Sequence, residues 1–200
     1  MYSMNKNRSS VYIIGGIAAI LGIFLIVTYN GLVKKEEKVK VQWSEVQNAY
    51  QRRVDLIPNL VNTVRGGANF EQKTLTDVAE ARAKATSVNV SSTDVSSDGY
   101  EAQKNAQDAL ATAANRLLIS IEKYPELQGQ RAFTTLQTQL ERTELRIKTA
   151  RKDFNAAVQD YNSSVRGFPT KLAAGIFGFR PKEGFSSNAG AERATEIKFK

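Results

Sequence analysis

The sequence places a charged residue, Arg53, where its neighbours predict a buried apolar side chain. Val46 lies seven residues before Arg53 and Leu60 lies seven residues after it, so the three share one face of a helix. A guanidinium buried on such a face needs a carboxylate partner, because an unpaired buried charge is costly. We expect Glu144 or Glu122 to supply that carboxylate.

Two kinds of chemistry fit a cluster of arginine and carboxylates. One is a structural ion network that fixes the register of packed helices. The other is a catalytic site in which carboxylates and arginine act on a phosphoryl or glycosyl group. A catalytic site needs a cleft, which the filled apolar seam described below does not predict. We therefore favour the structural network, to which we also assign Asp55, Arg82 and Arg151.

Histidine and cysteine are both missing from the sequence. Without histidine there can be no Ser-His-Asp triad, no histidine general base and no metal site with histidine ligands. This excludes the diiron site that four-helix bundles can carry, since that site uses Glu-x-x-His pairs. Without cysteine there are no disulfides and no thiol nucleophiles. We expect no catalytic residues, no metal and no cofactor, and therefore a protein that is not an enzyme.

An uncharged apolar run, residues 11–29, has the length of a bilayer-spanning helix. A helix rises ~1.5 Å per residue, so about 20 residues cross the ~30 Å of hydrocarbon. Lys6 and Arg8 precede the run, as they would in a secretory signal peptide. A signal peptide, however, has a shorter apolar region and ends at a small-residue cleavage site, which is missing here. We predict an uncleaved single-pass anchor in the cell membrane, preceded by a short polar stretch, residues 1–10.

Residues beside the span indicate where the membrane surface lies. More basic residues follow the span than precede it, which favours a cytoplasmic soluble domain. The segment 171–180 is short and amphipathic, and it either lies on the membrane surface or folds back to cap the soluble domain. The expected interface residues are Tyr29, Lys34, Lys35, Ile176, Phe177 and Phe179.

Beyond the span, apolar residues recur with helical spacing in separate segments. The first helix starts at the membrane and continues to Val64, with a kink expected before Pro58. A second helix is expected over 71–86 and a third over 100–124, with a polar loop at 87–99 between them. The residues expected to be buried on these helices are Val39, Trp43, Val46, Tyr50, Ile57, Leu60, Val64, Leu75, Val78, Ala85, Ala106, Leu110, Ala113, Leu117, Ile121 and Tyr124.

The fourth helix carries the strongest pattern, a seven-residue repeat over 133–168. A helix of about 55 Å cannot stabilise itself unless its apolar seam packs on partners. The same chain supplies those partners, so we predict an all-α fold, an antiparallel up-and-down four-helix bundle over 30–168. A free-standing coiled-coil dimer is the alternative. The seam residues are Phe133, Leu140, Ile147, Phe154, Tyr161 and Phe168, with Leu136, Ala150 and Ala157 between them.

Two asparagines follow seam aromatics, Asn155 after Phe154 and Asn162 after Tyr161. Packing in the seam explains the aromatic residues. The asparagines lie one step off the seam, where they either bond to a neighbouring helix or face water. We favour the exposed position.

The formal net charge of +8 bears on the choice of partners. The excess of basic residues near the membrane and in the C-terminal third suits an anionic lipid surface, although alternating charges on solvated faces also explain it. We expect no nucleic-acid partner, because acids are interleaved with the bases and no binding motif occurs. A homo-oligomer through the span is an alternative, since Gly15, Ala18, Ala19 and Gly22 form small-xxx-small pairs.

Taken together, these segments resemble the LemA family of bacterial membrane proteins. The most specific string is RRVDLIPNLV at 52–61, and a departure is Asn69-Phe70-Glu71, where many relatives have His-Glu. The resemblance extends to about Phe185 and includes an amphipathic segment at 169–185, whereas residues 186–200 look untypical of the family and are expected to be disordered. The residues that carry it include Trp43, Ala81-Arg82, Tyr124-Pro125, Ala150-Arg151, Phe154-Asn155, Tyr161-Asn162 and Phe168-Pro169.

The resemblance implies an N-terminal anchor and an antiparallel helical bundle, without an agreed biochemical activity. Relatives in magnetosome-forming bacteria resemble organelle-membrane proteins. We therefore expect a membrane-anchored, non-catalytic scaffold or adaptor whose partners are the lipid bilayer and other membrane or envelope proteins. The alternative is a membrane-shaping protein that binds anionic lipid through a basic helical face, and an enzyme is the third candidate.

Overall fold

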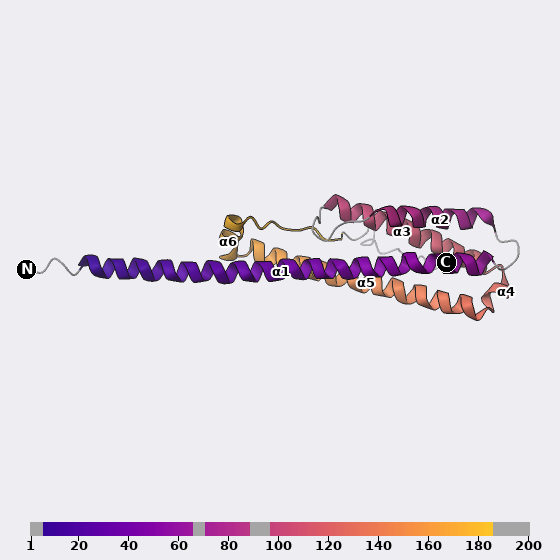
Figure 1. The fold of residues 1–200 in the computed structure, drawn as a ribbon, viewed down its shortest axis with the longest axis horizontal. Coiled ribbons are helices and arrows are strands. Elements are labelled where there is room, and N and C mark those ends of the chain that lie inside the picture. The colour runs from indigo at the N-terminus through magenta and orange to yellow at the C-terminus, as the bar shows by residue number, and fades with distance from the viewer. Residues whose placement is uncertain (1–5, 66–70, 89–96, 186–200) are drawn as a thin grey trace, which may run out of the picture.

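The computed structural model describes residues 6–65, 71–88 and 97–185, and every regular element within these ranges is a helix (Figure 1). The predicted all-α fold is confirmed. The expected disordered tail and most of the expected polar loop lie outside the described residues. The helices are α1 (Lys6–Arg65), α2 (Gln72–Ser87), α3 (Ser97–Ile121), α4 (Pro125–Gln128), α5 (Arg131–Arg166) and α6 (Thr170–Phe177).

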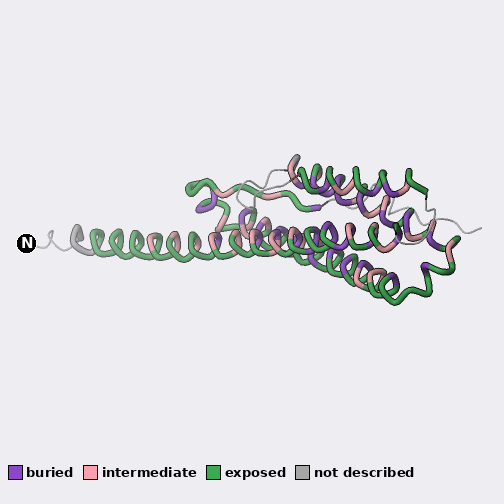
Figure 2. Tube along the Cα trace, turned by 45° about the vertical axis from the view of Figure 1, so that its right-hand side comes forward, coloured by how far each residue is buried: buried purple, intermediate pink, exposed green. Residues whose placement is uncertain are grey.

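Helix α1 contains the candidate membrane span and is also the first helix of the bundle. Its N-terminal part contains an 18-residue window with a mean hydropathy of 2.6, none of which is buried within the chain (Figure 2). A core helix of a soluble protein would be covered on at least one side, so this exposed apolar surface fits a helix that crosses a bilayer. Among the described residues, α1 is the one helix long and apolar enough to do so.

The predicted apolar stripe of α1 is buried along its whole length in the bundle. Each of its residues is at most 2% exposed, from Val39 to Val64. The helix also continues past Pro58 to Arg65, although proline lacks the N–H that an interior helical position needs. The partner of this stripe is chiefly α5, which runs back along α1 towards the membrane (Figure 1).

Helix α5 confirms the seven-residue repeat except at its last position. Five of the six seam residues, from Phe133 to Tyr161, are at most 5% exposed, whereas Phe168 is 86% exposed. The expectation that Phe168 is buried is therefore wrong. Gly167 leaves the helix with an extended backbone (φ −73°, ψ 146°), and Phe168 precedes Pro169, a position that disfavours helical backbone. The repeat is helical in sequence, but the helix stops before its final residue.

Helices α2 and α3 pack on each other and cover the C-terminal half of α1. Helix α3 begins three residues before the predicted Tyr100 and ends at Ile121, because a turn leads into Pro125 and the short α4. All the apolar residues predicted to face the core of α2 and α3 are buried or partly buried. The chain thus completes an antiparallel helical bundle from its own helices.

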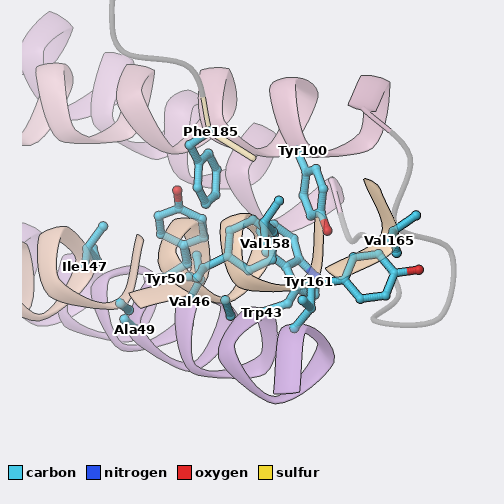
Figure 3. Packing of buried hydrophobic residues seen from close by; sticks show 14 of the residues in the cluster. Trp43, Val46, Ala49, Tyr50, Tyr100, Ile147, Val158, Tyr161, Val165 and Phe185 are labelled. Atoms are coloured by element: carbon cyan, nitrogen blue, oxygen red, sulfur yellow. The ribbon is translucent and has the colours of Figure 1, made fainter. Parts of the chain in front are cut away.

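The buried residues form two clusters along the bundle. The cluster nearer the membrane joins α1 and α5 and contains aromatic rings in edge-on and tilted contact (Figure 3). Trp43 lies 4.4 Å from Tyr100 and 5.4 Å from Phe154 between ring centroids. The second cluster lies further from the membrane and adds side chains of α2, α3 and α4. Arg53 comes from α1 between the residues of these two clusters.

Candidate functional site

Arg53 is buried, with 2% of its surface exposed, and each nitrogen of its guanidinium donates hydrogen bonds. Nε donates to Oε1 of Glu144 over 2.7 Å, and Nη2 donates to Oε2 of the same carboxylate over 2.5 Å. Nη1 donates to the backbone carbonyl and the side-chain oxygen of Gln107, over 2.9 and 3.2 Å. This two-point pairing links α1 to α5 and α3, which suits an ion pair that fixes helix register.

The other residues assigned to the network lie elsewhere. Glu122 is exposed and follows the last residue of α3, Ile121, which lies about 21 Å along that helix from Gln107. Asp55 is exposed and accepts a bond from Gln51 over 2.8 Å. Arg151 lies 3.6 Å from Asp108, so it forms a separate pair between α5 and α3. The structure therefore contains one compact pair at Arg53 and Glu144, with other charges distributed around it.

Arg82 has a role that its sequence position did not reveal. Its Nε donates to the backbone carbonyl of Val54 over 3.1 Å. In an unbroken helix that carbonyl would accept the N–H of residue 58, but residue 58 is a proline and has no N–H. Arg82 on α2 thus supplies the donor that Pro58 removes from α1. This contact explains how α1 continues through a proline while its buried carbonyl stays bonded.

A cavity of about 280 Å³ lies beside Tyr50, where α1 meets α2 and α3. The hydroxyl of Tyr50 and Oε1 of Gln103 are buried and have no hydrogen-bond partner among the described residues. Burial raises the pKa of Tyr50 to about 12, so this hydroxyl is protonated at neutral pH. The described lining consists of amides, hydroxyls and small apolar groups without a carboxylate. It therefore offers hydrogen bonds but no general base.

Residues 178–185, which we call the C-terminal strap, run in non-helical conformation back along α5. Asn155 and Asn162 hold it, each through two bonds to one backbone residue. Asn162 bonds the N–H and the carbonyl of Lys182 over 2.8 and 2.7 Å, and Asn155 does the same for Phe185 over 2.9 and 3.1 Å. The expectation that these asparagines face water is wrong.

The spacing of these contacts follows from elementary geometry. Seven residues of helix rise about 10.5 Å, and three residues of extended chain cover about 10 Å. Asparagines seven residues apart on α5 therefore meet strap residues three apart, namely 182 and 185. Nearer α6, the hydroxyl of Tyr161 donates to the carbonyl of Arg180 over 3.0 Å, and burial raises the pKa of Tyr161 to about 12.

The strap ends in the aromatic cluster nearer the membrane. Phe185 lies 5.5 Å from Phe154 and 5.8 Å from Trp43 between ring centroids (Figure 3). The guanidinium of Arg151 covers the Phe185 ring at 4.6 Å. Lys182 adds an ion pair of 2.8 Å to Glu36 on α1. The strap therefore contributes Phe185 to the core, while most of its other residues stay at the surface.

At the other end of the strap, α6 lies beside the membrane exit of α1. Tyr29 contacts both predicted interface aromatics, with centroid distances of 4.9 Å to Phe177 and 5.7 Å to Phe179. Ile176 is 69% exposed, and Lys34 is also exposed. Three of the six predicted interface residues thus contact one another, and Lys35 pairs with an acid of α5, Asp160, over 2.7 Å.

A cleft of about 650 Å³ opens between the strap, α5 and the membrane exit of α1. Its lining includes Tyr29 and Tyr161 together with charges of both signs, Glu36, Arg180 and Lys182. The ion pair between Glu36 and Lys182 already satisfies two of these charges. Among the described residues no group of acidic side chains is arranged to hold a metal ion. The cleft is a polar surface feature beside the end of the apolar run of α1.

Comparison with known proteins identifies relatives over most of the chain. The model of the LemA family matches residues 42–199. Magnetosome protein MamQ 2 of Paramagnetospirillum magneticum is 26% identical over 178 residues, covering 80% of this chain and 65% of that protein. Magnetosome protein MamQ of Magnetospirillum gryphiswaldense has the same identity and coverage. Protein LemA of Metamycoplasma hominis is 24% identical over 157 residues, covering 77% of this chain and 68% of that protein.

The chain spans 65% of the length of the MamQ proteins that it matches. The family model includes the strap and continues to residue 199, so the expectation that the sequence after Phe185 departs from the family is wrong. The match covers well over half of the chain, including α2 to α6 and α1 from residue 42 onwards. The chain belongs to the LemA family.

Proposed function

We propose that this protein is a membrane-anchored, non-catalytic scaffold that presents the sides of its helical bundle to other membrane or envelope proteins. The observation that supports this most directly is the continuity of α1 from the span into the bundle. Residues 30–65 of that helix extend about 54 Å from the membrane exit. A bundle built on such a helix projects its long faces away from the bilayer at a defined orientation.

The same geometry favours a scaffold over a membrane-shaping protein. A protein that shapes a bilayer with the length of its helices must lay them along the lipid surface. Here the bundle follows the axis of the membrane span, so its long faces stand off the bilayer (Figure 1). Two relatives are named magnetosome proteins, which supports a role within a larger membrane structure.

The chemistry of the interior supports a non-catalytic role. The one buried charge, among the described residues, that reaches a carboxylate by two bonds is Arg53, and its bonds are all used to join helices. The amide-lined cavity beside Tyr50 lacks a general base among its described residues. These interior groups stabilise the folded bundle. Contacts with other proteins are then made by the exposed faces of its helices.

The test is site-specific photo-crosslinking of the full-length protein in its native membrane. Photoreactive residues are introduced at Leu145 on α5 and Ile119 on α3, which are 66% and 63% exposed. A scaffold should give discrete protein adducts that depend on the position of the probe. Ile20 in the span, 69% exposed, is the matched control for contacts inside the membrane. Two results would contradict the proposal. One is an identical set of adducts at both bundle positions, and the other is a diffuse set of many proteins without a discrete product.

A further inference from the structure

An apolar face of α6 and the turn before it is exposed at the level of the membrane. Phe168 is 86% exposed, Leu172 62% and Ile176 69%. Leu172 and Ile176 are four residues apart on α6, so they form one row, and Phe168 lies in the turn before the helix, which begins at Thr170. The opposite side of α6 is covered, because Ala173 and Ala174 are at most 2% exposed and the helix packs on α1 and α5. The helix is therefore docked on the bundle by one face and uncovered on the other.

The height of this face is fixed by its contact with the anchor. The uncharged run of α1 ends at Tyr29, and the Phe177 ring lies 4.9 Å from the Tyr29 ring. Figure 1 shows α6 as the part of the folded domain nearest the N-terminal half of α1. Because α1 crosses the bilayer up to about Tyr29, α6 lies at the boundary between hydrocarbon and headgroups.

The charges around α6 suit the phosphates of a lipid surface. The acidic residues of α1 and α5 at this level are engaged in ion pairs: Glu36 with Lys182, and Asp160 with Lys35. Glu37 pairs with Lys40. The exposed charged residues near α6 are mostly basic, namely Lys34, Arg166, Lys171 and Arg180, with Glu183 of the strap as an acidic residue among them. An apolar row between cations is the pattern of a helix that lies in the membrane interface.

We propose that α6 is an interfacial helix, whose exposed Leu172 and Ile176, together with Phe168 in the turn before it, insert into the headgroup region of the bilayer that α1 crosses. The domain then has two attachments to the membrane, the span and α6. A single helix leaves the domain free to rotate about its axis, whereas two attachments fix which side of the bundle faces the lipid. This inference rests on the anchor and the geometry of α6, and it does not depend on the scaffold proposal.

The absence of cysteine from the chain permits a clean test with single spin labels. The full-length protein with Ile176→Cys is labelled and reconstituted into vesicles of phosphatidylcholine and phosphatidylglycerol in equal parts. The collision rate of the label is measured with oxygen, which concentrates in lipid, and with a water-soluble nickel chelate. Ile23→Cys in the span and Leu145→Cys on α5 are the lipid and water references, since these residues are 62% and 66% exposed.

The label at Ile176 should show an oxygen-to-nickel ratio shifted from the Leu145 value towards the Ile23 value. Circular dichroism should be unchanged in all three variants, because each replaces an exposed side chain. A ratio equal to that at Leu145 would show that α6 faces water and would overturn the proposal. Low collision with both reagents would also overturn it, because a second copy or another protein would then cover this face.

Discussion

Replacing Arg82 with alanine should leave the carbonyl of Val54 without a donor. Val54 is 3% exposed, so water has little access to replace the lost bond of 3.1 Å. An unsatisfied buried acceptor costs about 1 to 3 kcal/mol. At about 2 to 4 °C per kcal/mol for a protein of this size, the loss is readily measured by thermal melting.

The informative comparison is the same substitution in a Pro58→Ala background. Alanine at position 58 restores the N–H that bonds the Val54 carbonyl within α1, and it removes a proline penalty of up to about 3 kcal/mol. In that background Arg82 is no longer needed as a donor. Arg82→Ala should therefore cost clearly less than it does with Pro58 present, which gives a coupling energy of about 1 to 2 kcal/mol.

The assay is circular dichroism melting of the full-length protein in detergent for the two single variants and the double variant. Lys84→Ala is the matched control, since Lys84 is an exposed basic residue on the same helix. Its effect should stay within about 0.5 kcal/mol. If the effects of Arg82→Ala and Pro58→Ala add within about 0.5 kcal/mol, the two residues do not share the Val54 carbonyl, and the reasoning is refuted.

Three further predictions concern buried polar groups. Arg53→Met should destabilise the bundle by about 3 to 5 kcal/mol and Glu144→Leu should largely rescue it in thermal melts, whereas additive losses would exclude a structural pair. Asn155→Ala should cost about 1 to 3 kcal/mol and release the strap amide at 185 to hydrogen exchange, and unchanged protection would show that the strap is held otherwise. Tyr50→Phe should be neutral or stabilise the protein by about 1 kcal/mol, since the hydroxyl has no described partner. Because burial raises the pKa of Tyr50 and of Tyr161 to about 12, their contribution to stability is full below pH ~10 and lost as the pH rises towards 12. The melting temperature should fall across that window, and fall less in Tyr50→Phe; equal pH profiles would contradict the assignment.

The helices and their core could be predicted because both depend on local sequence. The stripe from Val39 to Val64 and the seam of α5 are buried as their spacing indicates. A seven-residue repeat specifies a face, and only one face of each helix is apolar enough to be covered. The failure at Phe168 has the same origin, since periodicity does not register that Gly167 and Pro169 end the helix.

The polar contacts were less predictable, because each joins segments that share no pattern. The expected burial of Arg53 required a carboxylate partner, and Glu144 on the fourth helix and Glu122 on the third were both candidates. Arg82 could have been connected with Pro58 only by asking which donor replaces the missing N–H at Val54. Asn155 and Asn162 bind backbone groups of the strap, whose sequence carries no period to reveal that it is extended.

The strap connects the membrane surface to the aromatic core with little slack. From Tyr29 to Trp43, α1 rises about 21 Å over fourteen residues. Phe177 contacts the first of these residues and Phe185 the second, so the strap covers a similar distance with eight residues. Eight residues reach at most about 26 to 29 Å when fully extended. A displacement of α6 by more than a few ångströms must therefore break the asparagine bonds or pull Phe185 from between its aromatic neighbours, which makes the lipid-facing helix and the core of the bundle one mechanical unit.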